Sequence, residues 1–334
     1  MIPVGIVVRN VNHALPRAVN LLNSCGKKHV SRNGPVLEYP GMVCTTYTNP
    51  CERVLFSPAR NAHPYFHFFE ALWILAGRDD VAWISYFLKN IAQYSDDGTV
   101  FRGAYGKRMR DHFDHDQLDW LVKHLKEDPF SRRAVITLFD ANYDHVSGKD
   151  IPCNLACDFL IRAGALHLTV FNRSNDVLWG AYGANVVQFS TLLEWVAGRL
   201  GVSVGTYTQV SNSFHVYTDT EVWQNVCDIH ATPIDPYNTA QFLQDEWKPV
   251  VHPFRMQSNE WHYDLGDFML RPLHTYIKTA AFNSQYFNHV VVPLYNSFTA
   301  YKQKDMNVAL AYASQCHATD WRMAVEQWLL RKAK

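Results

Sequence analysis

The order of helix-like and strand-like segments in this sequence predicts an α+β protein. Amphipathic helix patterns and short strands follow each other without the regular strand–helix–strand alternation of parallel α/β folds. The chain has 334 residues, of which 48% are hydrophobic and 14% aromatic. A chain of this size and composition can bury a large core, and we expect it to be ordered over most of its length.

Apolar residues at helical spacing predict four helices in the first two thirds of the chain. One dense apolar and aromatic pattern ends before Gly77, and another ends before Asp128 and Pro129. From about Pro253 onward the pattern is again mostly helical, up to the basic residues at the end of the chain. The expected helices cover residues 13–24, 64–76, 116–126 and 185–200.

Strand patterns occupy the centre of the chain. Two of them flank Ala163 and Gly164, which predicts a β-hairpin, and residues 31–35 read as a turn or loop. The expected strands cover residues 134–139, 157–162, 165–171 and 204–210.

Bulk properties exclude several classes of function. The chain has 31 basic and 31 acidic residues, which argues against a nucleic-acid groove. No stretch approaches the roughly 20 apolar residues of a membrane span, and residues 1–8 do not resemble a signal peptide. The seven cysteines show no zinc-binding spacing, and their odd number favours reduced thiols in the cytoplasm. We therefore expect no metal site and no membrane contact.

Several polar residues stand out locally, and each allows two interpretations. Cys153 follows a proline at the start of a strand. It could be an exposed nucleophile or a small buried hydrophobic residue. Arg173 follows an apolar strand and could bind phosphate or lie in a surface turn. The pair Arg132 and Arg133 could be an anion site or a solvated edge. Glu70 lies in an aromatic helix, either on a thin solvent stripe or deliberately buried.

The order of these motifs along the chain resembles the thymidylate synthase family, which includes nucleotide hydroxymethylases. The resemblance runs from about Arg32 to Tyr217. It implies an α+β fold with a mixed β-sheet packed against helices, and one sheet face forming a homodimer interface. It also implies a catalytic domain over residues 1–250, with residues 251–334 as a helical C-terminal extension.

The resemblance implies catalytic roles for four residues. Cys153 would attack C6 of a pyrimidine nucleoside monophosphate, because C5 is a poor nucleophile until addition at C6 creates an enolate. Arg173 would lie beside the sulfur and favour its thiolate form. Glu70 would relay protons, with a pKa raised by burial. Tyr105 would assist proton removal from C5.

Other residues would bind the substrate. In the family pattern, Arg32, Ser174 and Arg173 bind the 5′-phosphate, and several donors around one dianion are chemically reasonable. Arg132 and Arg133 resemble the pair that reaches this phosphate from the partner subunit. A homodimer with shared phosphate sites is therefore implied.

The base and the sugar would be read further along the chain. Asn185 resembles the asparagine that reads O4 and N3 of uracil, where deoxycytidylate hydroxymethylases carry an aspartate. The interval from Gly180 to Asn185 has one residue more than the family pattern. His215 and Tyr217 resemble the pair that holds the sugar 3′-hydroxyl, and Asp176 resembles a residue that contacts folate.

Three departures from the synthase pattern predict how the reaction ends. Asn154 replaces a histidine after the nucleophile, and Ala92 and Ser95 fall where the synthase has tryptophans beside the folate. The short apolar tail that closes over the folate is replaced by the helical extension. A site open to water would convert the exocyclic methylene intermediate into a hydroxymethyl group. We therefore expect 5-hydroxymethyl-dUMP as the product, with 5,10-methylenetetrahydrofolate as co-substrate.

Three alternatives stay open at this point. The chain could be a thymidylate synthase that releases dihydrofolate, a CMP or dCMP hydroxymethylase, or a non-catalytic nucleotide-binding homologue. The joint presence of Cys153, Arg173, Glu70 and Tyr105 argues against the last, since a binder needs neither a thiol nor a proton relay. Ribose and deoxyribose are not distinguished. Enzymes of this kind are associated with phages that carry modified DNA and with nucleoside antibiotic pathways. The expected location is the cytoplasm, that of the host if a phage encodes the chain.

Overall fold

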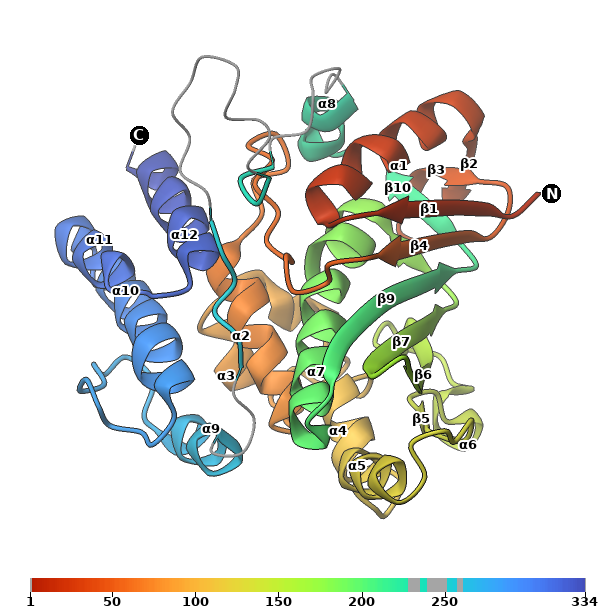
Figure 1. The fold of residues 1–334 in the computed structure, drawn as a ribbon. Coiled ribbons are helices and arrows are strands. Elements are labelled where there is room, and N and C mark those ends of the chain that lie inside the picture. The colour runs from red at the N-terminus through yellow and green to blue at the C-terminus, as the bar shows by residue number, and fades with distance from the viewer. Residues whose placement is uncertain (1, 228–234, 239–250, 257–260, 334) are drawn as a thin grey trace.

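The computed structural model describes the chain except for residues 1, 228–234, 239–250, 257–260 and 334. Its architecture is α+β, as predicted. In Figure 1 a mixed sheet lies on the right, helices α2 (Pro64–Leu75) and α7 (Asn185–Leu200) lie in the middle, and C-terminal helices lie on the left. The main core fills the space between these layers.

A six-stranded mixed sheet carries the catalytic segment. Its strand pairs are parallel for β1–β4 and β7–β9 and antiparallel for the other three. The hairpin between β6 and β7 turns at Ala163 and Gly164, which both have positive φ, as a two-residue hairpin turn requires. In spatial order the strands are β1 (Val4–Val8), β4 (Val43–Tyr47), β9 (Ser203–Ser211), β7 (Ala165–Asn172), β6 (Asn154–Arg162) and β5 (Val135–Thr137).

The strand expected over residues 134–139 is shorter than predicted. Only Val135–Thr137 pairs with β6, because the backbone N–H groups of Leu138 and Phe139 both donate to the same carbonyl, that of Leu155. The chain leaves the sheet there, beside a bulge in β6.

A second, four-stranded sheet assembles residues from distant parts of the sequence. In register, His215 lies opposite Glu38 on one side and Asp176 on the other. The turn expected at residues 31–35 joins the first two strands. The order is β2 (Lys27–Ser31), β3 (Gly34–Tyr39), β10 (Phe214–Tyr217) and β8 (Asn175–Asp176).

The four expected helices of the first two thirds are present as α1 (Val11–Cys25), α2, α5 (Gln117–Glu127) and α7. Asp116 caps α5 through its side chain, and Gly201 ends α7 with a left-handed φ of 70°. Shorter helical segments are α3 (Val81–Ser85), η1 (Lys89–Tyr94), α4 (Tyr105–Arg110), α6 (Ala141–Asp144) and α8 (Glu221–Cys227).

The last third is helical, as predicted, and it packs against α2. The rings of Phe68 and Trp321 lie 5.1 Å apart, and the Tyr65 and Ser297 hydroxyls are 2.6 Å apart. The expected domain boundary at residue 250 lies outside the described residues. The C-terminal elements are α9 (Trp261–Leu270), η4 (Phe287–Val291), α10 (Val292–Lys302), α11 (Met306–Ser314) and α12 (Thr319–Lys332).

The packing on both sides of α2 explains why its sequence is apolar all round the helix. A helix that is apolar all round is a buried helix, and nearly every side chain of α2 is buried. Glu70 interrupts this run, and it faces a cavity rather than a stripe of open solvent. None of the helices in the described part of the chain is long and apolar enough to cross a bilayer.

Candidate active site

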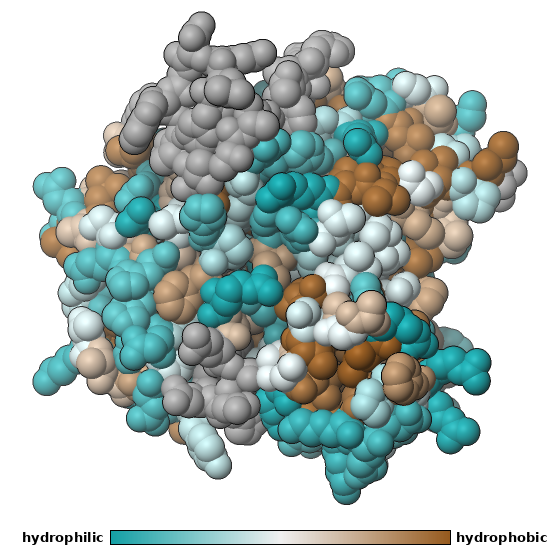
Figure 2. All heavy atoms as spheres, viewed as in Figure 1, coloured by the Kyte–Doolittle hydropathy of each residue, from teal (hydrophilic) through white to brown (hydrophobic). Residues whose placement is uncertain are grey.

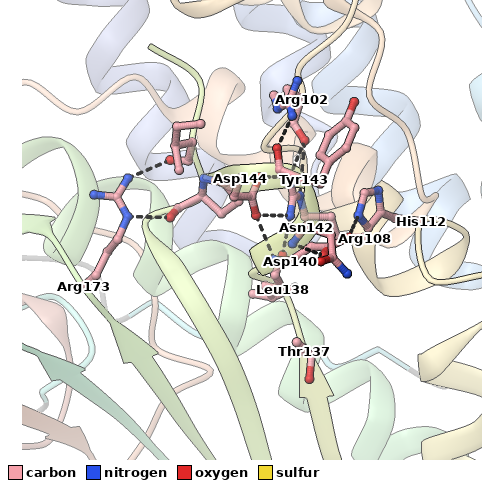
Figure 3. Close-up of polar contacts among 12 residues, drawn as sticks. Arg102, Arg108, His112, Thr137, Leu138, Asp140, Asn142, Tyr143, Asp144 and Arg173 are labelled. Atoms are coloured by element: carbon pink, nitrogen blue, oxygen red, sulfur yellow. Dashed lines mark hydrogen bonds and ion pairs between the residues drawn. The ribbon is translucent and has the colours of Figure 1, made fainter. Parts of the chain in front are cut away.

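Cys153 lies immediately before β6, in a segment that Arg173 holds in place. The Arg173 guanidinium donates to the backbone carbonyls of Pro152 at 2.8 Å and Ile151 at 3.0 Å, as Figure 3 shows. One of its terminal nitrogens lies 3.8 Å from the Cys153 sulfur. The Arg173 backbone N–H donates to the carbonyl of Cys153 as well. The half-buried thiol and the guanidinium are therefore fixed side by side.

The positive charge of Arg173 lowers the pKa of the Cys153 thiol, as expected, but burial has a larger effect on this pKa. Burial raises the pKa of the Cys153 thiol above its usual value, whereas Arg173 and Arg32 lower it and Asp150 raises it further. Arg173 therefore favours the thiolate, as expected, and burial opposes it. We expect the thiol to give up its proton as it attacks.

A cavity of about 450 Å³ opens beside this segment and contains five of the predicted substrate residues. The turn between β2 and β3 supplies one arginine, which also donates to the carbonyl of Gly148 at 2.9 Å. The rings from β10 meet edge to face with centroids 5.5 Å apart. The five residues are Arg32, Arg173, Ser174, His215 and Tyr217.

This arrangement suits a phosphorylated ligand with a hydroxylated body. Arg32, Arg173 and Ser174 offer guanidinium and hydroxyl donors, which match the many acceptor sites of a phosphate. His215 and Tyr217 add polar ring atoms that can exchange hydrogen bonds with a hydroxyl group.

One wall of this cavity is braced by a buried ion pair, drawn in Figure 3. Arg108 is fully buried and makes two hydrogen bonds of 2.7 Å with the carboxylate of Asp144, which lines the cavity. Arg108 also donates to the carbonyl of Leu138, and Asp144 accepts from the backbone of Asp140. A bidentate pair of this kind is geometrically specific, so residues 138–144 are held in one position.

A second cavity, of about 200 Å³, contains the predicted proton-transfer residues Glu70 and Tyr105. Glu70 accepts a hydrogen bond of 2.7 Å from the side chain of Gln188. Burial raises the pKa of the Glu70 carboxyl to about 7, so it can give and take protons near neutrality. The interpretation of Glu70 as a deliberately buried carboxylate is therefore the one that fits.

The catalytic segment contributes a residue to each of the two cavities. Asp150 lines the smaller cavity and Ile151 lines the larger. Tyr105, at the start of α4, contacts Asn154 through its side chain, and burial raises the pKa of its hydroxyl well above the usual value, with the neighbouring Cys153 adding to the effect. The segment just before Cys153 thus contributes Ile151 to the anion-binding cavity and Asp150 to the cavity with proton-transfer groups.

Comparison with known proteins identifies the family. A profile described as thymidylate synthase matches residues 58–233. A protein from Pseudomonas phage M6, named deoxyuridylate hydroxymethyltransferase, is 40% identical over 98% of this chain and 94% of its own length. The chain belongs to the thymidylate synthase family. It is therefore a one-carbon transferase, as predicted.

Two further relatives agree with this assignment. A deoxyuridylate hydroxymethyltransferase from Bacillus phage SP01 is 44% identical over 53% of this chain and 49% of its own. The crystal structure of thymidylate synthase from T4 phage matches with a TM-score of 0.54 and 18% identity. That match covers 65% of this chain and 80% of the other, and it confirms the predicted fold.

The segment that contains the additional residue before Asn185 forms a π-helical turn, η2 (Val177–Ala184). A π turn contains one residue more than an α turn, so an insertion can be absorbed without shifting the helix that follows. Asn185 then begins α7, where its side chain is buried and donates to the side-chain oxygen of Asn175 at 3.0 Å. It does not line either cavity.

Three further predicted residues lie outside both cavities. Asp176 accepts from the backbone N–H groups of Leu178 and Trp179 and so caps η2, and burial raises its pKa. Arg132 and Arg133 are exposed before β5. Their predicted roles, in folate contact and across a dimer, stay predictions.

The folate site without stacking residues at Ala92 and Ser95 stays a prediction. Ala92 and Ser95 do not line the smaller cavity, because the Ser95 hydroxyl turns into its own loop and donates to the carbonyl of Val100 at 2.6 Å. Aromatic side chains from other positions line it instead, namely Trp73, Tyr94 and Phe101. The smaller cavity therefore has an aromatic wall.

Sequence reasoning missed several polar residues in these cavities, and three of them carry or approach a charge or pair with one. Gln188 and Asp150 line the smaller cavity, and Glu38 lines the larger, 2.5 Å from the ring of His29. Burial acts to raise the pKa of Glu38, but hydrogen bonds from Ser213 and His29 lower it overall. A usable signal existed for Gln188, which is a polar residue one helical turn after Asn185 within an apolar run.

Proposed function

We propose that this enzyme transfers a one-carbon unit from 5,10-methylenetetrahydrofolate to C5 of dUMP and completes the reaction with water, giving 5-hydroxymethyl-dUMP. The observation that carries the proposal is that Cys153 lies beside Arg173, in a segment whose residues Ile151 and Asp150 line the two cavities. The names of the phage M6 and SP01 relatives favour deoxyuridylate and a hydroxymethyl product.

The nucleotide would occupy the larger cavity. Its 5′-phosphate would accept hydrogen bonds from Arg32, Arg173 and Ser174, and its 3′-hydroxyl would lie against His215 and Tyr217. This orientation brings the base toward Cys153 and the smaller cavity. The folate would then approach the base from the smaller cavity, whose walls include Trp73, Tyr94 and Phe101. Asp176 is retained as a proposed folate contact.

The chemistry follows from this placement. The Cys153 sulfur adds to C6 and the electron pair moves through C5 to O4, where protonated Glu70 stabilises the developing charge. C5 then attacks the one-carbon unit, and Tyr105 assists removal of the C5 proton. Loss of tetrahydrofolate leaves an exocyclic methylene at C5. Addition of water to this carbon and departure of the Cys153 thiolate complete the reaction.

A substrate panel tests the proposal. The protein is incubated with methylenetetrahydrofolate and each of dUMP, dCMP, UMP and CMP, and the nucleotide products are identified by mass. We expect turnover of dUMP with release of tetrahydrofolate. Turnover of a cytosine nucleotide alone would replace the proposed substrate. An absence of turnover with all four would favour the non-catalytic alternative.

Asn185→Asp is expected to shift the base preference toward cytosine. A carboxyl group matches N4–H₂ and N3 of cytosine better than an amide does. The ratio of kcat/KM for dCMP over dUMP should rise at least about tenfold, equivalent to about 1.4 kcal/mol. Asn142→Asp, at an exposed position outside both cavities, is the matched control. An unchanged ratio would mean that another group reads the base.

We further propose a homodimer through the face of the six-stranded sheet opposite α7. Cross-strand neighbours form a row of mostly short side chains on this face, and Val7 and Val135 at its ends are 61% and 41% exposed. Figure 2 shows groups of hydrophobic residues at the surface on the side that carries β1 and β9. The row consists of Val7, Thr46, Thr208, Thr169, Asp158 and Val135.

Mixing two inactive chains tests whether phosphate sites are shared across this dimer. An Arg133→Ala chain keeps Cys153, and a Cys153→Ser chain keeps Arg133, so a hybrid dimer contains one complete site. An equal mixture refolded together should recover about a quarter of the wild-type activity, because half the dimers are hybrids with one working site. Hybrid dimers that are verified by mass yet inactive would show that each site is built from one chain.

The enzyme would work in the cytoplasm, that of the host if a phage encodes it. The phage origin of the relatives supports this placement.

A further inference from the structure

Asp150 lies in the smaller cavity, three residues before the nucleophile. It lines this cavity together with Glu70, Tyr105 and Gln188. It is close enough to Cys153 to raise the pKa of the thiol electrostatically. A carboxylate is therefore placed in the cavity of the proton-transfer residues, near the nucleophile.

The Asp150 carboxylate accepts backbone hydrogen bonds, but one of its two oxygens has no partner among the described residues. The backbone N–H groups of Gly103 and Arg102 donate to it. Its Oδ2 atom is buried and has no hydrogen-bond partner among the described residues, and the same holds for Oε1 of Gln188. Buried polar atoms are nearly always satisfied by protein or water, and a water needs two to four polar partners. Both residues line the cavity of about 200 Å³, which has room for a water molecule beside them.

The other acid–base groups in this cavity are already engaged. Glu70 accepts from Gln188 and has a place in proton transfer at O4. Tyr105 interacts with Asn154 beside the nucleophile. Asp150 is the remaining carboxylate that lines the cavity, and neither of these steps uses it.

We propose that Asp150 is the general base that activates the water which ends the reaction. This inference rests on the proposed function and deepens it. The water oxygen forms a bond to the exocyclic methylene carbon while its proton passes to Asp150. The electron pair of the methylene double bond moves toward O4. It then returns to form the C5–C6 double bond as the C6–S bond breaks, and the proton passes from Asp150 to the Cys153 thiolate.

The surroundings of Asp150 favour this role. Burial raises the pKa of its carboxyl, with nearby Asp96 acting in the same direction, so it is a stronger base than an exposed aspartate. Positioned general bases typically accelerate a step by about 10²–10⁴-fold. A general base for water in this cavity would explain the hydroxymethyl product by a residue of the protein, and not only by exposure of the intermediate to solvent.

The test separates the last step from the earlier ones. Asp150→Asn keeps the size of the side chain and an oxygen that can accept from the backbone, but it removes the base. Under single-turnover conditions with enzyme in excess, tritium release from C5 of labelled dUMP reports every step through proton removal. Formation of hydroxymethyl product reports the capture of water.

For Asp150→Asn we expect tritium release near the wild-type rate and hydroxymethyl formation slowed by about 100-fold or more. The nucleotide joined to Cys153 should accumulate, and its detection by protein mass spectrometry also shows that the variant is folded. Asp114→Asn is the matched control, because Asp114 is exposed, does not line the cavity and does not act on Asp150. It should leave both rates unchanged.

Two outcomes would overturn the role of Asp150 while leaving the proposed function intact. One is hydroxymethyl formation by Asp150→Asn at the wild-type rate. The other is an equal slowing of tritium release and product formation, which would indicate an earlier or structural role. A methyl product with dihydrofolate from the wild-type enzyme is a separate pattern, and it would overturn the proposed function and this inference together.

Discussion

Replacing Cys153 with serine should lower kcat by about 10⁴-fold or more while nucleotide binding changes little. Serine keeps the shape of the side chain, but its hydroxyl is a far weaker nucleophile than a thiolate, and loss of a nucleophile removes the covalent route. Binding should survive because the phosphate donors Arg32, Arg173 and Ser174 remain in place. Steady-state turnover and equilibrium dialysis with labelled dUMP measure the two effects separately.

The control for this substitution is Cys25→Ser. Cys25 is an exposed thiol at the end of α1 and does not line either cavity, so activity should be retained. Turnover by Cys153→Ser within a factor of ten of the wild type would exclude Cys153 as the nucleophile.

Replacing Glu70 with glutamine should lower kcat/KM by about 10²–10⁴-fold, the range expected for loss of a general acid or base. Glutamine keeps the size and can still pair with Gln188, but it cannot exchange a proton near neutrality. Glu127→Gln, at an exposed position at the end of α5, controls for the chemical change alone.

The pH dependence gives this substitution a second readout. Burial raises the pKa of Glu70 to about 7, and the protonated form is needed when charge develops at O4. The wild-type kcat/KM should therefore fall as the pH rises through about 7, and Glu70→Gln should lack this limb. A Glu70→Gln profile that keeps the same limb would assign it to another group.

The main secondary structure could be predicted from sequence because periodicity and caps were clear. The apolar run ending before Gly77 and the hairpin at Ala163 and Gly164 both form as expected. The fold class followed from their order. Strand ends were less predictable, since the shortened β5 depends on a carbonyl of Leu155 that accepts twice.

Parts of the site depended on three-dimensional packing that sequence order does not contain. Glu38 meets the larger cavity only because β3 pairs with β10 opposite His215. The aromatic wall of the smaller cavity comes from Trp73 and Phe101 and not from positions 92 and 95. Asp150 gave no signal in the sequence, because its importance comes from an unpaired oxygen in a shared cavity.

The central claim is that water, and not a hydride from folate, completes the one-carbon transfer. The most direct test is to run the wild-type reaction with dUMP and methylenetetrahydrofolate in water enriched in ¹⁸O, and to determine the masses of the nucleotide and folate products. The account predicts 5-hydroxymethyl-dUMP with ¹⁸O in its new hydroxyl, together with tetrahydrofolate. A methylated nucleotide without ¹⁸O, accompanied by dihydrofolate, would contradict it.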